Sequence, residues 1–157
     1  MQVFPDGQFC VDVNGTIAGS ATSIIVSLKP EYRSHSLYEI LGSGHNPNGD
    51  SLYVDDILTH PLYRRRGIGT ALMNARKDLC IKFGLRRIIG GGRLSNYCNF
   101  SNTMSAEKYA NLVVIKKLVD PVLSFDIKNG FKFIKILPNY SADQRLLNFA
   151  SFIEWKP

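Results

Sequence analysis

The sequence has little cysteine, and its few cysteines are not arranged to build a disulfide framework or a metal centre. Cys10, Cys80 and Cys98 are an odd number in 157 residues and lack metal-ligand spacing. We therefore expect reduced thiols in a cytoplasmic protein that binds no metal. His35 and His45 lie in a polar stretch without further ligand residues, which also argues against a metal site.

Long apolar runs are missing as well. Stretches such as Ser23–Leu28 and Leu112–Ile115 are far too short to cross a bilayer. The first residues lack the basic region and apolar run of a secretory signal, so we expect no membrane partner. Internal repeats, low-complexity segments and linkers are also absent. A length of 157 residues suits one hydrophobic core, which predicts a single domain over residues 1–157.

Acidic residues are fewer than basic ones, 13 against 19, which gives a formal net charge of +6. Such an excess favours anionic partners, namely nucleic acid, acidic lipid or a phosphorylated small molecule, or it serves solubility alone. Arg64, Arg65 and Arg66 are consecutive and lead directly into glycines, whereas the other basic residues are scattered. Because interleaved aromatic residues do not accompany them, a nucleic-acid-binding module ranks last among the hypotheses.

Hydrophobic periodicity predicts strands alternating with helices. Asn14-Gly15 is a strong hairpin signal, because both residues tolerate positive φ. Strands are predicted over Gln8–Val13, Ile17–Leu28, Leu52–Thr59, Arg86–Ile89, Phe131–Leu137 and Leu146–Trp155. Helices are predicted over Ile68–Phe83, over Met104–Leu118 and from Asp120-Pro121 to Asn129-Gly130, with a short one near Tyr38–Leu41. The order β-β-β-α-β-α-α-β-β indicates a mixed α/β fold.

The segment from Leu58 to Leu72 carries the motif with the clearest chemistry. A strand ends at Thr59, a turn follows, and a helix begins at Gly67-Ile68-Gly69. Free backbone N–H groups and the positive end of the helix dipole then point at one spot, which binds phosphate well. Glycine lets the phosphate oxygens approach the backbone. The spacing matches neither a dinucleotide fingerprint nor a nucleotide triphosphatase loop, so we expect a pyrophosphate site of another kind.

This segment resembles the GNAT superfamily of N-acetyltransferases. Arg64-Arg65-Arg66-Gly67-Ile68-Gly69 is similar to the family's pyrophosphate loop, Arg/Gln-x-x-Gly-x-Gly/Ala. Asn129-Gly130-Phe131 resembles the Gly-Phe step between its last helix and sixth strand. Three further stretches look like a GNAT subgroup found beside carbon–nitrogen hydrolase domains: Gly91–Leu94, Asp120–Phe125 and Leu137–Tyr140.

The resemblance implies an α/β (α+β) GNAT-like fold with a mixed, mostly antiparallel central sheet flanked by helices. It also implies transfer of an acetyl group from acetyl-CoA to a primary amine by direct attack in a ternary complex. Backbone groups of Leu58 and Thr59 would then pair with the pantetheine arm. The pyrophosphate would be held by Arg64, Arg65, Arg66, Gly67, Ile68, Gly69 and Thr70.

Two departures from the family pattern leave alternatives open. The position where many members carry a tyrosine acid is Asp126, so the acid is missing or comes from elsewhere, with Tyr97 and Tyr140 as candidates. The usual first strand and two helices before the hairpin are also lacking. The acceptor site would then be open, completed by another subunit, or part of a shortened domain. A non-catalytic CoA-binding domain is the alternative function, and the exposed first strand favours a homodimer.

Asp55 and Tyr53 lie two apart on the central strand and share a face, while Asp56 would face the other way. The resemblance implies that this face, near the middle of the strand, carries the residue that takes the proton of the amine, which makes Asp55 the candidate general base. Arg93 and Tyr97 follow the fifth strand of the family pattern, where the acceptor would sit; Tyr97 is thus also a catalytic candidate. The alternatives are packing, ion pairing and loop stabilisation.

Overall fold

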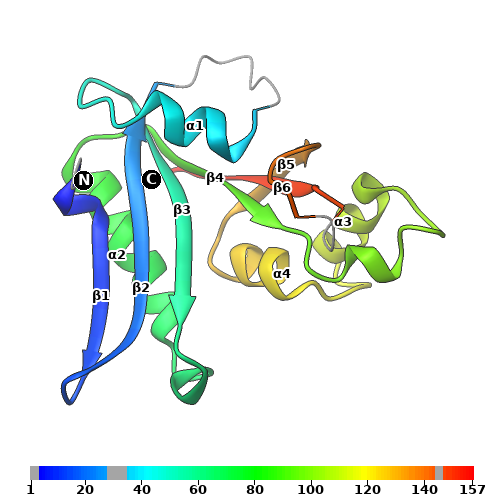
Figure 1. Cartoon of the computed structure of the whole chain (residues 1–157), viewed down its shortest axis with the longest axis horizontal. Helices are drawn as coiled ribbons and strands as arrows, with labels where there is room; N and C mark the ends of the chain where they lie inside the picture. Colours follow the sequence, from blue (N-terminus) through cyan, green and yellow to red (C-terminus); the bar gives the residue numbers. More distant parts are fainter. Residues whose placement is uncertain (1–3, 28–34, 144–146) are drawn as a thin grey trace. The chain divides into compact units, whose positions relative to one another are not determined.

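The structure, a computed structural model of the chain, describes residues 4–27, 35–143 and 147–157. Its strands form a sheet in the order β1-β2-β3-β4-β6-β5 (Figure 1). The strands are β1 Gln8–Val13, β2 Thr16–Val26, β3 Ser51–Thr59, β4 Arg87–Arg93, β5 Lys132–Leu137 and β6 Ala150–Trp155. The α-helices are α1 Leu37–Ser43, α2 Ile68–Lys82, α3 Ala106–Val114 and α4 Pro121–Lys128. Contacts divide the described residues into two compact units, one of residues 4–27, 44–89 and 156–157 and one of 35–43, 90–143 and 147–155.

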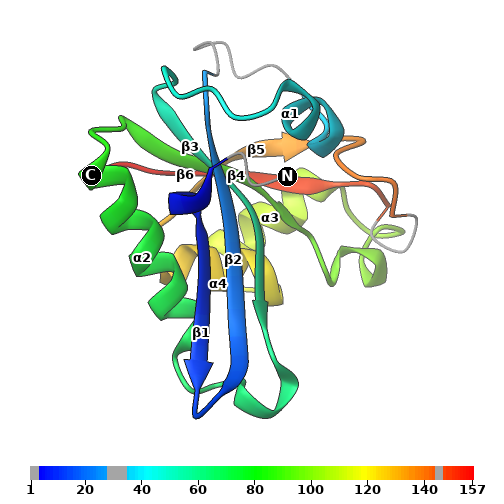
Figure 2. The same cartoon turned by 60° about the vertical axis from the view of Figure 1, so that its left-hand side comes forward.

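The first unit is built on a hairpin of β1 and β2. Asn14 and Gly15 both have positive φ, 52° and 82°, and the Gly15 N–H donates to Asp12 Oδ1 (2.9 Å). These are the conformations that a two-residue hairpin turn requires, so the predicted turn is confirmed. Strand β2 pairs antiparallel with both β1 and β3. Helix α2 packs against these three strands (Figure 2).

Strand β4 starts beside the start of β3. The Arg86 N–H donates to the Asp50 carbonyl (2.9 Å), and Arg87 Nε donates to Ser51 Oγ (2.8 Å). Because these contacts advance together along both segments, from Asp50 with Arg86 to Ser51 with Arg87, their order is that of a parallel pair, and helix α2 is the crossover between the two neighbouring strands. Together with the antiparallel pairs β1–β2, β2–β3 and β5–β6, this makes the sheet mixed.

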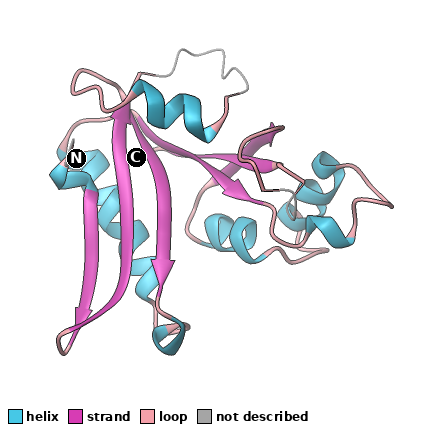
Figure 3. Ribbon diagram, in the orientation of Figure 1, coloured by secondary structure: helices cyan, strands magenta, loops and turns pink. Residues whose placement is uncertain are grey.

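The second unit contains the antiparallel pair β5–β6, with α3 and α4 packed on each other and on β5 (Figure 3). Asp120 caps α4, since its Oδ1 accepts from the N–H groups of Val122 and Leu123. Gly130 ends this helix region at φ 84°. The cap, the first-turn proline and the terminal glycine are the signals from which the helix was predicted.

Several boundaries differ from those predicted. Helix α3 is shorter than Met104–Leu118, because Ser105 caps its start and Lys116, at φ 60°, turns the chain after its end. Strand β4 continues through the glycines to Arg93 instead of stopping at Ile89. Strand β6 begins at Ala150, and Leu146, where the last strand was expected to start, lies outside the described residues. None of the helices in the described ranges is long and apolar enough to cross a membrane.

Candidate functional site

The turn between β3 and α2 is held by local contacts. The His60 N–H donates to the Ala18 carbonyl (2.9 Å), which extends the pairing of β3 with β2. His60 Nδ1 accepts from the Leu62 N–H (3.3 Å) and so caps a short 3₁₀ turn over Pro61–Tyr63. The Arg66 guanidinium lies over the Tyr63 ring, 5.2 Å from its centroid. His60 therefore stabilises the turn that precedes the glycine loop Gly67–Gly69.

The loop Arg64–Thr70, called the cradle below, has the backbone geometry of an anion-binding site. Arg65 and Gly67 have positive φ, 61° and 80°, and Gly67 is the N-cap of α2 without any side-chain cap bond. The first-turn N–H groups of Ile68, Gly69 and Thr70 precede the first intrahelical bond, which runs from Ala71 to the Gly67 carbonyl (2.9 Å). A Cβ built on Gly67 would meet nothing within 4 Å. The amides and the space beside them fit a pyrophosphate group.

Tight packing fixes the start of α2 on the sheet. A Cβ on Gly19 in β2 would lie 2.7 Å from Ile68 Cγ2 and 3.4 Å from a Leu72 methyl, so only glycine allows this approach. Ala18, Ala21, Ile68 and Leu72 form a buried cluster. The cluster holds the cradle as a rigid extension of the core.

Charge at the cradle comes from the arginine run. Arg64, Arg65 and Arg66 are all exposed. Among the described residues, none of the three forms an ion pair with a carboxylate. The three guanidinium groups could therefore make charge-assisted contacts with an anionic ligand.

Strand β3 departs from simple alternation at its two aspartates. Ser23 pairs with Val54 and Ala21 with Ile57, so Asp55 and Asp56 both lie opposite Thr22 in a β-bulge. The expectation that Asp56 faces away from Asp55 assumed a regular strand, and the bulge removes that assumption. Tyr53, the predicted neighbour of Asp55, is fully buried, whereas Asp55 is half-buried.

Beyond the bulge, β3 presents the segment predicted to bind pantetheine. Leu58 pairs with Ser20 and Thr59 with Gly19 in β2. The Leu58 side chain is 59% exposed although it lies in a central strand. The structure thus brings Leu58 and Thr59 together with the arginines and glycines of the loop in the first unit.

The other predicted residues belong to the second unit. Tyr97 is buried, and its hydroxyl donates to the Met104 carbonyl (3.1 Å). Its ring packs on Tyr109 and Phe149. Arg93 is exposed and lies 3.8 Å from the Asp143 carboxylate. Both residues therefore have structural partners in this unit.

Asp126 occupies the position where many family members have a tyrosine. It is buried, and a Cβ built on Gly92 would lie 2.9 Å from its Oδ2. Ser151 Oγ donates to the Gly92 carbonyl (3.1 Å) on the same stretch of β4. A Cβ on the preceding Gly91 would overlap the Tyr140 ring. The two glycines thus serve close side-chain packing against β4, which the sequence pattern did not reveal.

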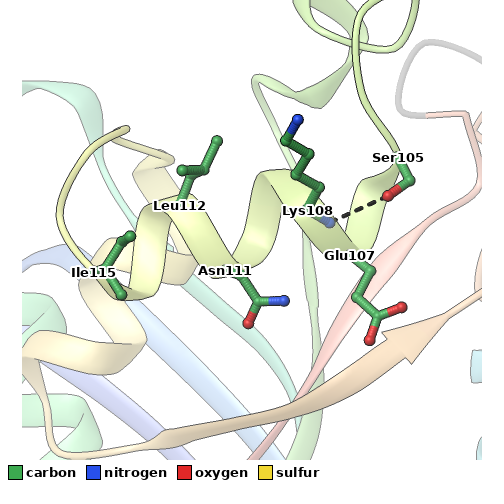
Figure 4. Close-up of a pocket in the computed structure, with 6 residues that line it drawn as sticks. All are labelled: Ser105, Glu107, Lys108, Asn111, Leu112 and Ile115. Atoms are coloured by element: carbon green, nitrogen blue, oxygen red, sulfur yellow. Dashed lines mark hydrogen bonds between the residues drawn. The ribbon is translucent and has the colours of Figure 1, made fainter.

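Outside these segments, the described residues include one depression and lack a metal-binding cluster. An open depression on one face of α3, with no predicted site residue, is lined by Ser105, Glu107, Lys108, Asn111, Leu112 and Ile115 (Figure 4). No group of three or more histidine, cysteine, aspartate or glutamate side chains in residues 4–27, 35–143 and 147–157 is placed to hold a metal ion.

The family model described as "Acetyltransferase (GNAT) family" matches residues 2–97. The chain belongs to this GNAT family. "Uncharacterized N-acetyltransferase YkwB" from Bacillus subtilis is 38% identical over 160 residues, which cover 99% of this chain and 71% of that protein. "Probable hydrolase YhcX" from the same organism is also 38% identical, but the GNAT chain spans only 31% of its length.

Solved structures agree on the GNAT fold. The loading GNATL domain of CurA from Lyngbya majuscula superimposes with a TM-score of 0.85 over 97% of this chain and 77% of that one, at 22% identity. The GphF GNAT-like decarboxylase, solved in complex with isobutyryl-CoA, gives 0.79 over 97% and 78%, at 19% identity. The predicted α/β GNAT-like fold is therefore confirmed.

One buried charged residue that contacts β2 and β3 at the bulge was missed by sequence reasoning. Arg76 lies on α2 four residues after Leu72 and three before Leu79, which is the spacing of the buried face. A charged residue at such a position was the signal, because arginine is almost never fully buried unless its donors are satisfied.

Proposed function

We propose that this GNAT chain is an N-acetyltransferase that moves an acetyl group from acetyl-CoA to a primary amine. The observation that carries the proposal is the cradle at the start of α2. There, a left-handed Gly67 with open space at its α-carbon begins the helix, and three exposed arginines immediately precede or adjoin it in the chain. Membership of the acetyltransferase family supports the reaction class.

In this proposal the CoA pyrophosphate is held by the loop from Arg64 to Thr70. The first-turn N–H groups of α2 donate to its oxygens, and the arginines neutralise its charge. The pantetheine arm extends along β3 and pairs with backbone groups of Leu58 and Thr59. These contacts place the thioester near the middle of β3, since the arm leads away from the loop along the strand.

The chemistry then requires one bond to form and one to break. The neutral amine attacks the thioester carbonyl, a C–N bond forms, the C–S bond breaks, and CoA leaves as a thiol after it takes up a proton. Asp55 is our candidate for the base that accepts the proton of the ammonium, directly or through water. Holding both substrates in one orientation supplies much of the rate enhancement.

The acid that protonates the leaving thiolate is not the tyrosine that many family members carry. Asp126 stands where the family's tyrosine would be, and it is buried against Gly92. Tyr97 could serve only if its hydroxyl were released from the Met104 carbonyl. Arg93 and Tyr97 remain our candidates for contact with the acceptor amine, and Tyr53 supports Asp55 from the same strand. We expect the protein to act in the cytoplasm and need no metal.

Calorimetry with acetyl-CoA tests the cradle. Gly67→Glu places a carboxylate where the pyrophosphate would bind, so we expect micromolar binding by the wild type and none by the variant. Gly84→Glu is the matched control, because Gly84 lies just after the other end of α2 with φ 62° and equally open space. It carries the same backbone strain and should bind normally. Equal affinity in all three proteins would refute the assignment.

A non-catalytic CoA-binding domain is the second candidate function. The observation that favours it is Asp126 at the position of the usual tyrosine acid. The two candidate functions are distinguished by incubating the protein with acetyl-CoA and a panel of polyamines, amino acids and peptides, while free CoA thiol is measured. Because one fold neighbour is a decarboxylase, malonyl-CoA without amine is tested as well, and its conversion to acetyl-CoA and CO2 is followed by mass spectrometry, since that reaction releases no thiol. Tight binding with neither thiol release nor loss of CO2 would favour the non-catalytic domain.

A further inference from the structure

Arg76 is a charged residue almost completely enclosed in the first unit, with 1% of its surface exposed. Its side chain crosses from α2 to the pair of strands β2 and β3. Nε donates to Ser23 Oγ (3.2 Å), and Nη2 donates to the Thr22 carbonyl (2.7 Å) and to the Asp56 carbonyl. Nη1 lies 3.7 Å from Met73 Sδ. One guanidinium group therefore bonds to both strands at the same point.

That point is the β-bulge of β3. Val54 pairs with Ser23, whose hydroxyl meets Arg76, and Ile57 pairs with Ala21 in the cluster beneath α2. Val54 and Ile57 thus both face α2, although residues three apart on a regular strand face opposite sides. The extra residue reverses the alternation. It decides that Ile57 points into the core and that Leu58 is left exposed on the other side.

A bulge leaves backbone groups without their ladder partners, and such groups are costly to bury. Arg76 supplies the missing donors to the carbonyls of Thr22 and Asp56. The Asp56 N–H is satisfied separately by Thr22 Oγ1 (3.3 Å). The planar guanidinium suits this task because its donors lie in a fixed fork, which the single ammonium of lysine cannot reproduce.

We propose that Arg76 is a positioning residue for the acyl-CoA site: it holds the β3 bulge, and the bulge orients Asp55 and the segment Ile57–Thr59. This inference rests on the proposed function. Without the hydrogen bonds of the Arg76 guanidinium, β3 can straighten or slip by one residue. Such a slip would exchange the sheet faces on which Ile57 and Leu58 lie. The cradle at Gly67 is held by a different set of contacts and would stay in place.

Two ligands separate the part of the site that Arg76 controls from the part that it does not. Acetyl-CoA contacts both the cradle and β3, whereas 3′-phospho-ADP, its nucleotide half, contacts only the cradle. We expect Arg76→Met, which keeps most of the volume but no donor, to weaken acetyl-CoA about tenfold. Its affinity for 3′-phospho-ADP should stay within about twofold of wild type. Arg76→Lys should recover part of the loss.

Leu79→Ala is the matched control. Leu79 is buried on the same face of α2, about one turn later, and no hydrogen bond of its side chain reaches the bulge. We expect it to lower the melting temperature while leaving both affinities within about twofold of wild type. Hydrogen exchange of the backbone over residues 53–60 gives a second readout. Exchange should accelerate there in Arg76→Met and not in Leu79→Ala.

The outcomes are distinguishable. Selective loss of acetyl-CoA affinity with faster exchange over residues 53–60 supports the role of Arg76. Unchanged acetyl-CoA affinity, or an equal loss for both ligands, overturns it, since a merely structural arginine would do one or the other. If Arg76→Met is insoluble, Arg76→Lys decides by the same comparison. Wild-type protein that binds neither ligand would refute the acyl-CoA site itself, and the inference about Arg76 with it.

Discussion

Cys80 differs from the two exposed cysteines in the surroundings of its thiol. Its side chain is fully buried in α2, where Sγ donates to the Leu85 carbonyl (3.6 Å). Burial raises the pKa of the Cys80 thiol to about 11. Because the thiolate is the reactive form, only about one thiol in a thousand would be ionised at pH 8. Cys10 and Cys98 are exposed and free.

We therefore expect a thiol reagent at pH 8 to label Cys10 and Cys98 quickly in the native protein, and Cys80 only after unfolding. Peptide mass spectrometry before and after addition of guanidinium chloride measures this. A protein carrying Cys10→Ser and Cys98→Ser isolates the remaining thiol, and its labelling rate should rise as the pH approaches 11. Fast native labelling of that protein at pH 8 would contradict the burial of Cys80.

At the scale of elements, the start of α4 depends on one carboxylate. Asp120 is fully buried. Its Oδ1 accepts from the N–H groups of Val122 and Leu123, at 3.0 and 3.1 Å. Its Oδ2 accepts from the Asn96 N–H and the Tyr109 hydroxyl, each at 3.0 Å. Burial, and then the charge and hydrogen bond of Asp120, raise the pKa of Tyr109. The carboxylate thus joins the cap of α4 to α3 and to the turn after β4.

Removing this carboxylate should cost more than removing an ordinary helix cap. Asp120→Ala leaves several buried donors unsatisfied, so we expect the free energy of unfolding to fall by about 3 kcal/mol or more. Ser105→Ala, which removes the single cap bond of α3 to the Lys108 N–H, should cost about 1 kcal/mol. Urea unfolding of the two variants compares them. Equal losses would mean that the bonds to Asn96 and Tyr109 contribute little.

The elements that the sequence predicted well are those whose signals are local. The hairpin at Asn14-Gly15 and the capped helix α4 are specified by a few adjacent residues, and both occur as expected. The course of β4 through Gly90-Gly91-Gly92 was not predicted. It depends on Tyr140, Asp126 and Ser151, which pack over these glycines from distant parts of the sequence.

The same distinction between local and distant signals applies to the candidate site. The cradle was predictable, because a strand, a turn, two glycines and a helix follow one another within a short segment. The bulge at Asp55 and Asp56 was not, since it is visible only in the pairing with β2. Arg76 was likewise hidden, because its partners lie more than 50 residues earlier in β2 and 20 residues earlier in β3. The motif does not identify the general acid either, because the position at which many family members carry a tyrosine is Asp126 here.

At the scale of the whole molecule, the net charge of +6 favours anions of any kind. In the proposed function the cradle would favour one kind, because its first-turn amides and left-handed Gly67 would contact a compact phosphate group directly. Acetyl-CoA bound there would lose affinity with salt only modestly, by less than about tenfold between 50 and 500 mM NaCl. A nucleic acid bound through the same arginines would lose affinity far more steeply, because many phosphate contacts release counterions together.

We therefore expect acetyl-CoA to bind with a shallow salt dependence and a single-stranded polynucleotide to bind weakly or not at all, as measured by fluorescence anisotropy and calorimetry across salt. Replacing Arg65 and Arg66 by glutamine should weaken acetyl-CoA about tenfold. The control replaces Lys116 and Lys117 by glutamine, which removes the same two charges from an exposed turn after α3 and should change little. If both double variants weaken acetyl-CoA equally, net charge rather than the cradle governs binding. Tight polynucleotide binding with a steep salt slope, lost only in the Arg65 and Arg66 variant, would reassign the arginines to nucleic acid.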